Sequence, residues 1–236
     1  MYLPQHFEET RLEVLHGLIR ARPLATLVTM TEQGLEANHV PLEIDPEPAP
    51  FGTLRGHVAR ANPLWRQAIA AGTSAAGASA AGTIAAGTGA AVESLAVFQG
   101  ADGYISPSWY PTKQRTGKVV PTWNYVVVHA YGPLRAVDDK EWLRSFVTRL
   151  TQRHESTRTV PWQVSDAPPD YIDSMLEAIV GIEMPLTRLS GKWKLSQNRV
   201  PADRAGVVEG LEKEPGETAA ALAALVASAA RKIEAE

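Results

Sequence analysis

The chain has 236 residues, 44% of them hydrophobic and 21% charged, so it can bury a sizeable core. Its formal net charge is −3 at pH 7, which disfavours a nucleic-acid-binding class, since such domains are usually basic. The absence of cysteine excludes disulfides, thiolate nucleophiles and zinc–thiolate sites, and it fits a reducing compartment.

Hydrophobic periodicity and turn residues predict a mixed set of helices and strands. In chain order we expect a helix at 9–21, strands at 24–29, 35–44 and 53–58, a helix start at Asn62 and Pro63, strands at 94–99, 104–106, 122–131 and 134–137, helices at 138–153 and 169–179, a strand at 181–186, and helices at 204–211 and from 218. Pro41 interrupts the second strand, which indicates an edge position or a bulge. The strands follow one another without βαβ crossovers, so we predict an α+β fold with an antiparallel β-barrel core.

Residues 70–91 are a low-complexity run of Ala, Gly, Ser and Thr. This composition predicts a flexible surface insertion, and the recurring glycines weigh against the alternative of an Ala-rich helix. The N-terminus lacks the pattern of a signal peptide, and no run approaches the roughly 20 apolar residues of a membrane span. We therefore expect a cytoplasmic protein without a membrane partner.

Several catalytic motifs are missing from the sequence. There is no G-x-x-x-x-G-K-[ST], G-x-G-x-x-G, G-x-S-x-G or H-E-x-x-H, so phosphate loops, a nucleophile elbow and a zincin site are not indicated. The six histidines are scattered, and no metal site is predicted from them.

Polar and aromatic residues gather instead in four clusters, at 37–42, at 53–63, at 104–111 with 118–125, and at 191–199. Arg and Lys can neutralise a phosphate, and Trp and Tyr can form flat walls for a ring system. The residues also have plainer explanations. Arg55, Arg60 and Lys118 can be solvated charges, and Trp109, Trp123 and Trp193 can be packing residues. His57 can be a hydrogen-bonded structural residue, and Asn62 can simply cap its helix. Together the clusters favour a site for a planar, phosphorylated ligand.

Long motifs in these clusters carry a family resemblance. They are M-Y-L-P-Q-H-F-E-E (1–9), P-L-A-T-L-V-T (23–29), G-L-E-A-N-H-V-P-L (34–42), G-T-L-R-G-H-V-A-R-A-N-P-L-W (52–65), Y-I-S-P-S-W-Y (104–110), K-V-V-P-T-W-N-Y-V-V-V-H-A-Y-G (118–132) and G-K-W-K-L-S-Q-N-R (191–199). The chain thereby resembles the PaiB family of FMN-binding negative transcriptional regulators. The resemblance implies an antiparallel split β-barrel of the FMN-binding type, decorated by helices, over residues 1–211, and leaves 212–236 as an Ala-rich C-terminal helix.

The same resemblance implies a homodimer with FMN sites at the subunit interface. The cofactor-binding residues it implies are Asn38, His39, Val40, Thr53, Leu54, His57, Arg60, Asn62, Trp123, Asn124 and Tyr125, with Lys192 and Gln197 reaching across from the partner subunit. No catalytic residue is predicted, because the flavin itself would exchange hydride with a small-molecule electron donor or acceptor.

Three functions stay open at this point. The first is an FMN-dependent oxidoreductase or a flavin-linked regulator of gene expression. The second is a DNA-associated repressor without catalytic activity, although the sequence shows no helix-turn-helix, basic helix or zinc finger. The third is haem binding or degradation, with His39, His57, His129 or His154 as the axial ligand.

Overall fold

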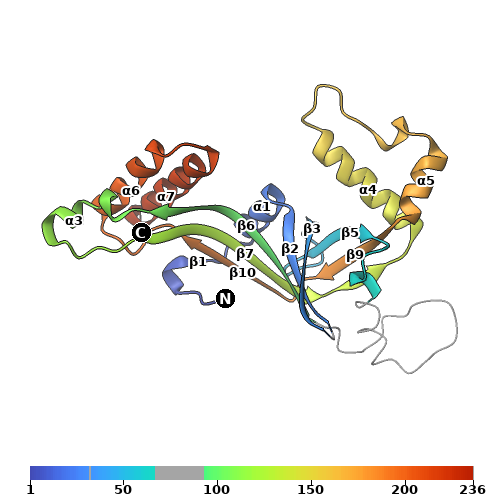
Figure 1. Ribbon diagram of the computed structural model, residues 1–236, viewed down its shortest axis with the longest axis horizontal. Helices are drawn as coiled ribbons and strands as arrows, with labels where there is room; N and C mark the ends of the chain where they lie inside the picture. The colour runs from blue at the N-terminus through green and yellow to red at the C-terminus, as the bar shows by residue number, and fades with distance from the viewer. Residues whose placement is uncertain (32, 67–92, 236) are drawn as a thin grey trace. The chain divides into compact units, whose positions relative to one another are not determined.

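The computed structural model describes residues 1–31, 33–66 and 93–235 (Figure 1). The predicted insertion at 70–91 lies outside these residues. The described chain forms two compact units: Met1–Leu18, Phe98–His129 and Ser190–Glu236 make the first, and Ile19–Val97 and Ala130–Leu189 make the second. Strands β6 (Glu93–Ile105) and β7 (Thr122–Pro133) run through both.

The first unit is an antiparallel sheet with two C-terminal helices packed on one face. Its strands are neighbours in the order β1 (Glu8–Glu9), β10 (Arg188–Lys194), β7 and β6. Its helices are η1 (Gln5–Phe7), α1 (Leu12–Ala21), η2 (Pro107–Trp109), α3 (Pro111–Thr116), α6 (Pro201–Lys213) and α7 (Glu217–Ala235). Helices α6 and α7 lie side by side over the sheet (Figure 1).

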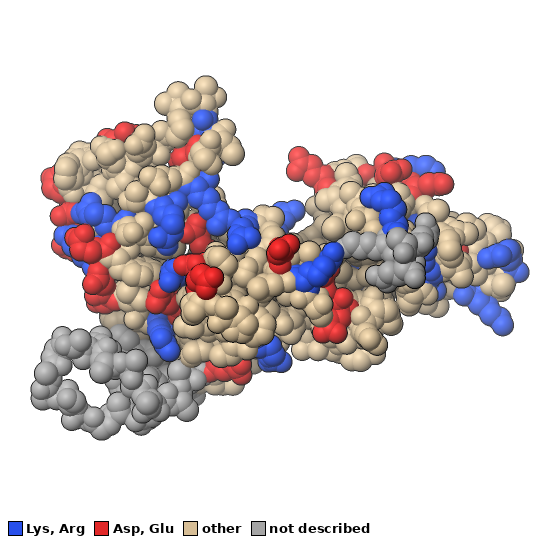
Figure 2. Space-filling view, turned by 180° about the vertical axis from the view of Figure 1, so that it is seen from behind, with Lys and Arg blue, Asp and Glu red and all other residues tan. Residues whose placement is uncertain are grey.

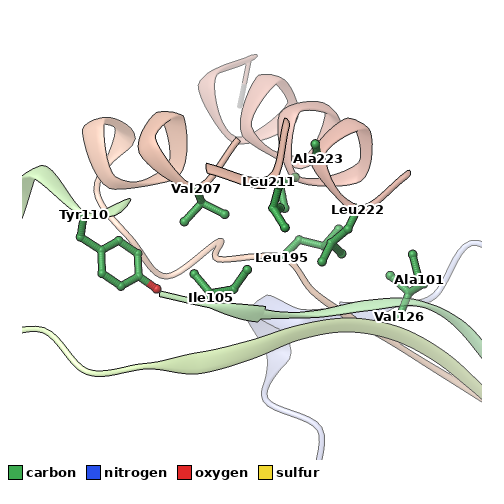
Figure 3. Close-up of a cluster of buried hydrophobic side chains, with 10 residues drawn as sticks. Ala101, Ile105, Tyr110, Val126, Leu195, Val207, Leu211, Leu222 and Ala223 are labelled. Atoms are coloured by element: carbon green, nitrogen blue, oxygen red, sulfur yellow. The ribbon is translucent and has the colours of Figure 1, made fainter. Parts of the chain in front are cut away.

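An apolar core joins α6 and α7 to that sheet (Figure 3). The sheet and the segment after β10 contribute Ala101, Ile105, Val126 and Leu195, and the helices contribute Val207, Leu211, Leu222, Ala223 and Val226. The Ala-rich C-terminal helix therefore belongs to the core of the first unit. Gly206 lets α6 approach η2, since a Cβ there would lie 2.0 Å from the carbonyl oxygen of Trp109.

The second unit holds two sets of antiparallel strands. Strand β2 (Leu24–Thr31) pairs with the start of β6 and with β3 (Gly34–Pro41). A four-stranded sheet follows the order β4 (Glu43–Asp45), β5 (Thr53–Ala59), β9 (Ile179–Pro185) and β8 (Arg135–Val137). The chain passes from one set to the other at Leu42, between the end of β3 at Pro41 and the start of β4 at Glu43.

Helices α4 (Lys140–Glu155) and α5 (Pro169–Glu177), with η3 (Val164–Asp166) between them, pack on the four-stranded sheet. The ring of Phe146 lies 5.9 Å from that of His57 in an edge-to-face contact. Gly181 gives Trp142 room, because a Cβ at this position would lie 2.4 Å from the indole ring. One face of β5 and β9 thus lies beneath α4.

The α+β fold with antiparallel strands and surrounding helices is confirmed, with several local corrections. The expected strands at 94–99 and 104–106 are one continuous strand, β6, and the strand expected at 35–44 is divided at Pro41. The predicted helix at 9–21 begins only at Leu12, after β1. Asp139, not Asp138, caps α4 by accepting a hydrogen bond from the backbone N–H of Trp142 (2.7 Å). Among the described helices, none combines the length and apolar character that crossing a bilayer requires.

Candidate functional site

The face of the first unit's sheet opposite α6 and α7 carries exposed aromatic side chains. Strand alternation directs Asn124 and Val126 of β7 toward the helices, and both are buried. Trp123 and Tyr125 therefore point to the other side. Trp123 is 52% exposed, and Tyr104 of β6 meets its ring edge-to-face at 6.2 Å.

Two lysines of β10 flank Tyr125 on this face. The Nζ atom of Lys192 lies 5.4 Å from the centre of the Tyr125 ring, and that of Lys194 lies 5.9 Å from it. Lys192 donates a hydrogen bond to the carbonyl oxygen of Tyr2 (3.0 Å), and Lys194 donates one to Oγ1 of Thr122 (2.7 Å). We call Trp123, Tyr125, Lys192 and Lys194 the Lys–Tyr face.

The Lys–Tyr face carries two lysines, and the exposed Glu8 stands opposite Lys192 in the pairing of β1 with β10. Within the described part of the chain, neither lysine forms an ion pair with Asp or Glu. Burial lowers the pKa of Lys194, and the nearby charges of Lys192 and Arg199 lower it further, although Tyr125 opposes this. A bound anion would relieve the repulsion between these cations, so the face is suited to a phosphate beside a flat ring.

A hydrogen-bonded turn follows β10 and supports the Lys–Tyr face. Asn124 donates to Oγ of Ser196 (2.9 Å), and Ser196 has a left-handed backbone with φ of 63°. Gln197 accepts from the backbone N–H of Leu195 (2.7 Å) and donates to the carbonyl oxygen of Trp193. Asn124 and Gln197, both predicted as cofactor contacts, thus position this turn through intramolecular bonds.

The predicted residues on β3 and β5 lie in the second unit. Asn62 donates from Nδ2 to Oδ1 of Asn38 (3.0 Å), so these two meet. His39 is exposed on β3. Val40, Thr53 and Leu54 are buried.

His57 and Arg60 are held by protein contacts. His57 lies against Phe146, and burial lowers the pKa of its imidazole. Arg60 donates to both carboxylate oxygens of Asp138 (2.9 and 2.7 Å) and to the carbonyl oxygens of Glu177 (2.6 Å) and Ile179 (3.0 Å). These contacts use most of its donors, which gives Arg60 a structural role in joining β5 to β8 and β9.

Three residues of the first unit's cluster are additional to the predicted set: Thr122, Lys194 and Ser196. Lys194 could have been predicted from the K-W-K sequence at 192–194, because residues two apart on a strand share a face and Lys192 was already a candidate. The hydroxyl contacts of Thr122 and Ser196 depend on pairing between segments about 70 residues apart, and no local pattern indicates them.

Comparison with known proteins decides the family. The model of a family described as "Putative FMN-binding domain" matches residues 1–188. The chain belongs to this FMN-binding family. The PAI 2 protein of Bacillus subtilis, described as a protease synthase and sporulation protein, is 31% identical over 233 residues, covering 98% of this chain and 99% of its own. The resemblance to the PaiB family is thereby confirmed.

Fungal relatives and solved structures extend the comparison. Uncharacterized proteins of Emericella nidulans and Aspergillus fumigatus are 35% and 36% identical, covering 90% of this chain and 90% and 91% of their own. A FAD- and haem-binding protein of Mycobacterium smegmatis has a TM-score of 0.55 at 15% identity, covering 84% of this chain and 78% of its own. The protein Rv2991 of Mycobacterium tuberculosis has a TM-score of 0.53 at 12% identity, covering 85% of this chain and 94% of its own. These likenesses show the split β-barrel fold.

The Lys–Tyr face fits the cofactor of this family. FMN has a phosphate that needs cationic donors and an isoalloxazine ring that needs flat walls. Lys192 and Lys194 supply positive charge, and Tyr125 and Trp123 supply aromatic surface on the same side of the sheet.

Proposed function

We propose that this protein binds FMN at the Lys–Tyr face and uses it to transfer electrons between small molecules. The observation that carries the proposal is the pair of β10 lysines beside Tyr125, neither of which forms an ion pair in the described part of the chain. When bound, the flavin would supply the exchange of hydride with a donor or acceptor. The protein's own residues would bind, orient and shield it.

Each residue of the Lys–Tyr face has a distinct role in this proposal. Lys194 and Lys192 neutralise the phosphate, and a bound phosphate would raise the lowered pKa of Lys194 toward its ordinary value. Tyr125 and Trp123 cover the apolar part of the ligand. Asn124 fixes the turn behind them through Ser196. The contacts that the family resemblance implies for Asn38, His39 and Asn62 stay predictions, and these residues are not part of the Lys–Tyr face.

A comparison of FMN with riboflavin tests the role of Lys194. Riboflavin has the same ring but lacks the phosphate, so Lys194→Met should weaken FMN binding and leave riboflavin binding nearly unchanged. Loss of one charge-assisted contact of about 1.5–3 kcal/mol corresponds to roughly a 10- to 150-fold rise in Kd.

Quenching of flavin fluorescence measures both affinities. Lys118→Met is the matched control, because Lys118 is an exposed lysine of the same unit and lies outside the Lys–Tyr face. Equal weakening of FMN and riboflavin would refute the phosphate role of Lys194. Wild-type protein that binds neither ligand would refute the proposed site.

We also propose that the protein is a homodimer. On β2 and β3, one face exposes Leu24 (61%), Met30 (54%) and Leu35 (75%), and Met30 pairs directly with Leu35. Exposed apolar side chains grouped in this way are typical of a protein interface. Sedimentation should give a dimer that Leu35→Glu dissociates, and a monomeric wild type would overturn the proposal.

A regulatory role would then act through the flavin rather than through direct contact with DNA. On the face in Figure 2, basic and acidic side chains are intermixed, whereas DNA-binding surfaces gather basic ones. Reduction of bound FMN by NADH or NADPH, followed by absorbance, tests the oxidoreductase function. Sequence-selective retardation of DNA at physiological salt, without flavin reduction, would favour the repressor instead.

A further inference from the structure

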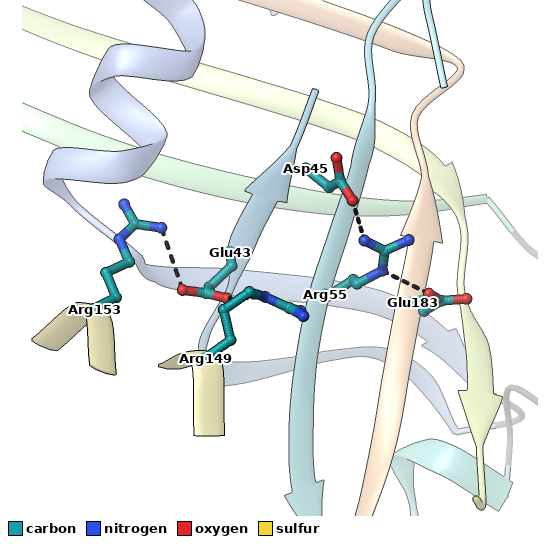
Figure 4. Close-up of polar contacts among 6 residues, drawn as sticks. All are labelled: Glu43, Asp45, Arg55, Arg149, Arg153 and Glu183. Carbon is teal, nitrogen blue, oxygen red and sulfur yellow. Dashed lines mark hydrogen bonds and ion pairs between the residues drawn. The ribbon is translucent and has the colours of Figure 1, made fainter. Parts of the chain in front are cut away.

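A row of alternating charges crosses the four-stranded sheet of the second unit. Glu43 of β4 pairs with Arg55 of β5, Arg55 pairs with Glu183 of β9, and Glu183 pairs with Arg135 of β8. Arg55 lies two residues from His57, so it shares the face that α4 covers. The carboxyl-terminal half of α4 adds Arg149 and Arg153 beside this row (Figure 4).

Apart from the exposed Arg135, these charges together with that of Asp45 balance as a set but not locally. At one end, the buried carboxylate of Glu43 lies 3.6 Å from Nε of Arg149 and 3.3 Å from Nη1 of Arg153, so one anion faces two cations. At the other end, Arg55 forms ion pairs with Asp45 and with Glu183, so one cation faces two anions. Figure 4 shows the two ends in sequence, from Arg153 to Glu183.

A cavity of about 350 Å³ opens between these two ends. Its lining includes Glu43, Asp45, Arg55, Arg149 and Arg153, together with Ile44 and Pro46. This volume lies at the lower end of the range of about 300–1,000 Å³ for small-molecule sites. A small charged ligand is therefore the right size for it.

Both ends have polar atoms to offer such a ligand. In the described part of the chain, Arg149 makes no hydrogen bond, so the terminal nitrogens of its guanidinium can donate to a carboxylate. Asp45 is 39% exposed at its side chain. The backbone N–H of Glu47 holds the pKa of Asp45 below its ordinary value, and Arg55 adds to this, so the carboxylate is charged at neutral pH.

We propose that this cavity binds a free α-amino acid as its zwitterion. Arg149 and Arg153 would receive the carboxylate, Asp45 would receive the ammonium group, and Pro46 would contact the side chain. A simple anion would leave the exposed carboxylate of Asp45 without a ligand partner, and a simple cation would leave the terminal donors of Arg149 without one. Only a ligand with both charges complements both ends.

Three probes separate the two charges in calorimetric titrations of the full chain. L-alanine carries both, propionate lacks the ammonium group, and ethylamine lacks the carboxylate. We expect L-alanine to bind at least roughly tenfold more tightly than either single-charge probe, because each end contributes a charge-assisted hydrogen bond. Equal affinities for the three probes, or no saturable binding of L-alanine, would overturn the proposal.

Substitutions identify the two ends separately. Arg149→Gln should weaken L-alanine binding at least roughly tenfold, whereas Arg144→Gln, on the same helix but paired with Asp173, should leave it unchanged. Asp45→Asn should weaken the binding of L-alanine, whereas the affinity for propionate should stay the same or rise. Unchanged L-alanine binding in both Arg149→Gln and Asp45→Asn would refute the site. The proposed FMN site lies on the first unit and this cavity lies in the second, so a failure of L-alanine binding and a failure of FMN binding can be told apart.

Discussion

Replacing Arg60 by alanine should destabilise the protein rather than abolish FMN binding. The substitution removes two hydrogen bonds to the carbonyl oxygens of Glu177 and Ile179 and a two-pronged ion pair with Asp138. Each bond to a carbonyl contributes about 1 kcal/mol. The Arg60 side chain is 36% exposed, so solvent screening limits the ion pair to at most about 1 kcal/mol. The free energy of unfolding should therefore fall by about 2–3 kcal/mol.

Urea denaturation followed by tryptophan fluorescence measures this change. Arg60→Lys should recover little of the loss, because an ammonium group cannot bond both carboxylate oxygens and two carbonyls in the geometry of a planar guanidinium. Arg66→Ala is the control: Arg66 is exposed and contacts the ring of Trp65, so its loss should cost well under 1 kcal/mol. Unchanged stability together with a tenfold or greater loss of FMN affinity in Arg60→Ala would refute the structural role and support a phosphate contact.

Three further predictions concern packing, pH and the turn after β10. Gly206→Ala should lower the free energy of unfolding by about 1–3 kcal/mol in thermal denaturation, because the added Cβ would collide with the backbone. Gly17→Ala in α1 meets open space, so its effect should lie between none and a gain of about 1 kcal/mol. Equal effects of the two substitutions would contradict the close approach of α6 to η2. Burial lowers the pKa of His57 below its ordinary 6.5, so the unfolded chain takes up the proton more readily, and stability should be full above about pH 6.5 and decline as the pH falls below it. His57→Gln should reduce that decline in urea titrations, and an identical pH profile would refute the assignment. Asn124→Ala should cost about 1–2 kcal/mol, since the buried hydroxyl of Ser196 loses a partner, and a loss below 0.5 kcal/mol would show that the bond is dispensable.

Much of the fold could be predicted because its signals are local. Pro41 marks the point where the chain leaves β3, and Gly34 marks the turn before it. The short strand β1 carries too few residues to show a period, so its pairing with β10 could not be predicted from its own sequence. The N-cap of α4 was misplaced by one residue because Asp138 and Asp139 are equally good caps. Only the tertiary contact with Arg60 distinguishes them.

The residue types of the candidate site could be predicted from the sequence, but the side of the sheet that each side chain faces could not. The motif T-W-N-Y indicates a polar and aromatic strand entrance, yet strand parity alone does not say which side faces a core. The packing of α6 and α7 on Val126 makes that choice and turns Asn124 inward and Tyr125 outward. The family resemblance implied Arg60 as a cofactor contact. Its acceptors in the protein lie 78 and 117 residues away in the chain, where no local pattern reveals them.

The pairing of β1 with β10 also means that β1 is synthesised long before its partner strand. Glu9 finds its strand partner, Gly191, only after about 180 more residues have been made. At about 5–20 residues per second, the N-terminal segment waits roughly 10–40 s on the ribosome before its sheet can close. Apolar residues of α1 such as Leu15, which packs at Gly191, stay uncovered on that side during this interval. Nascent chains should therefore bind holding chaperones through this segment, and release should follow the emergence of β10.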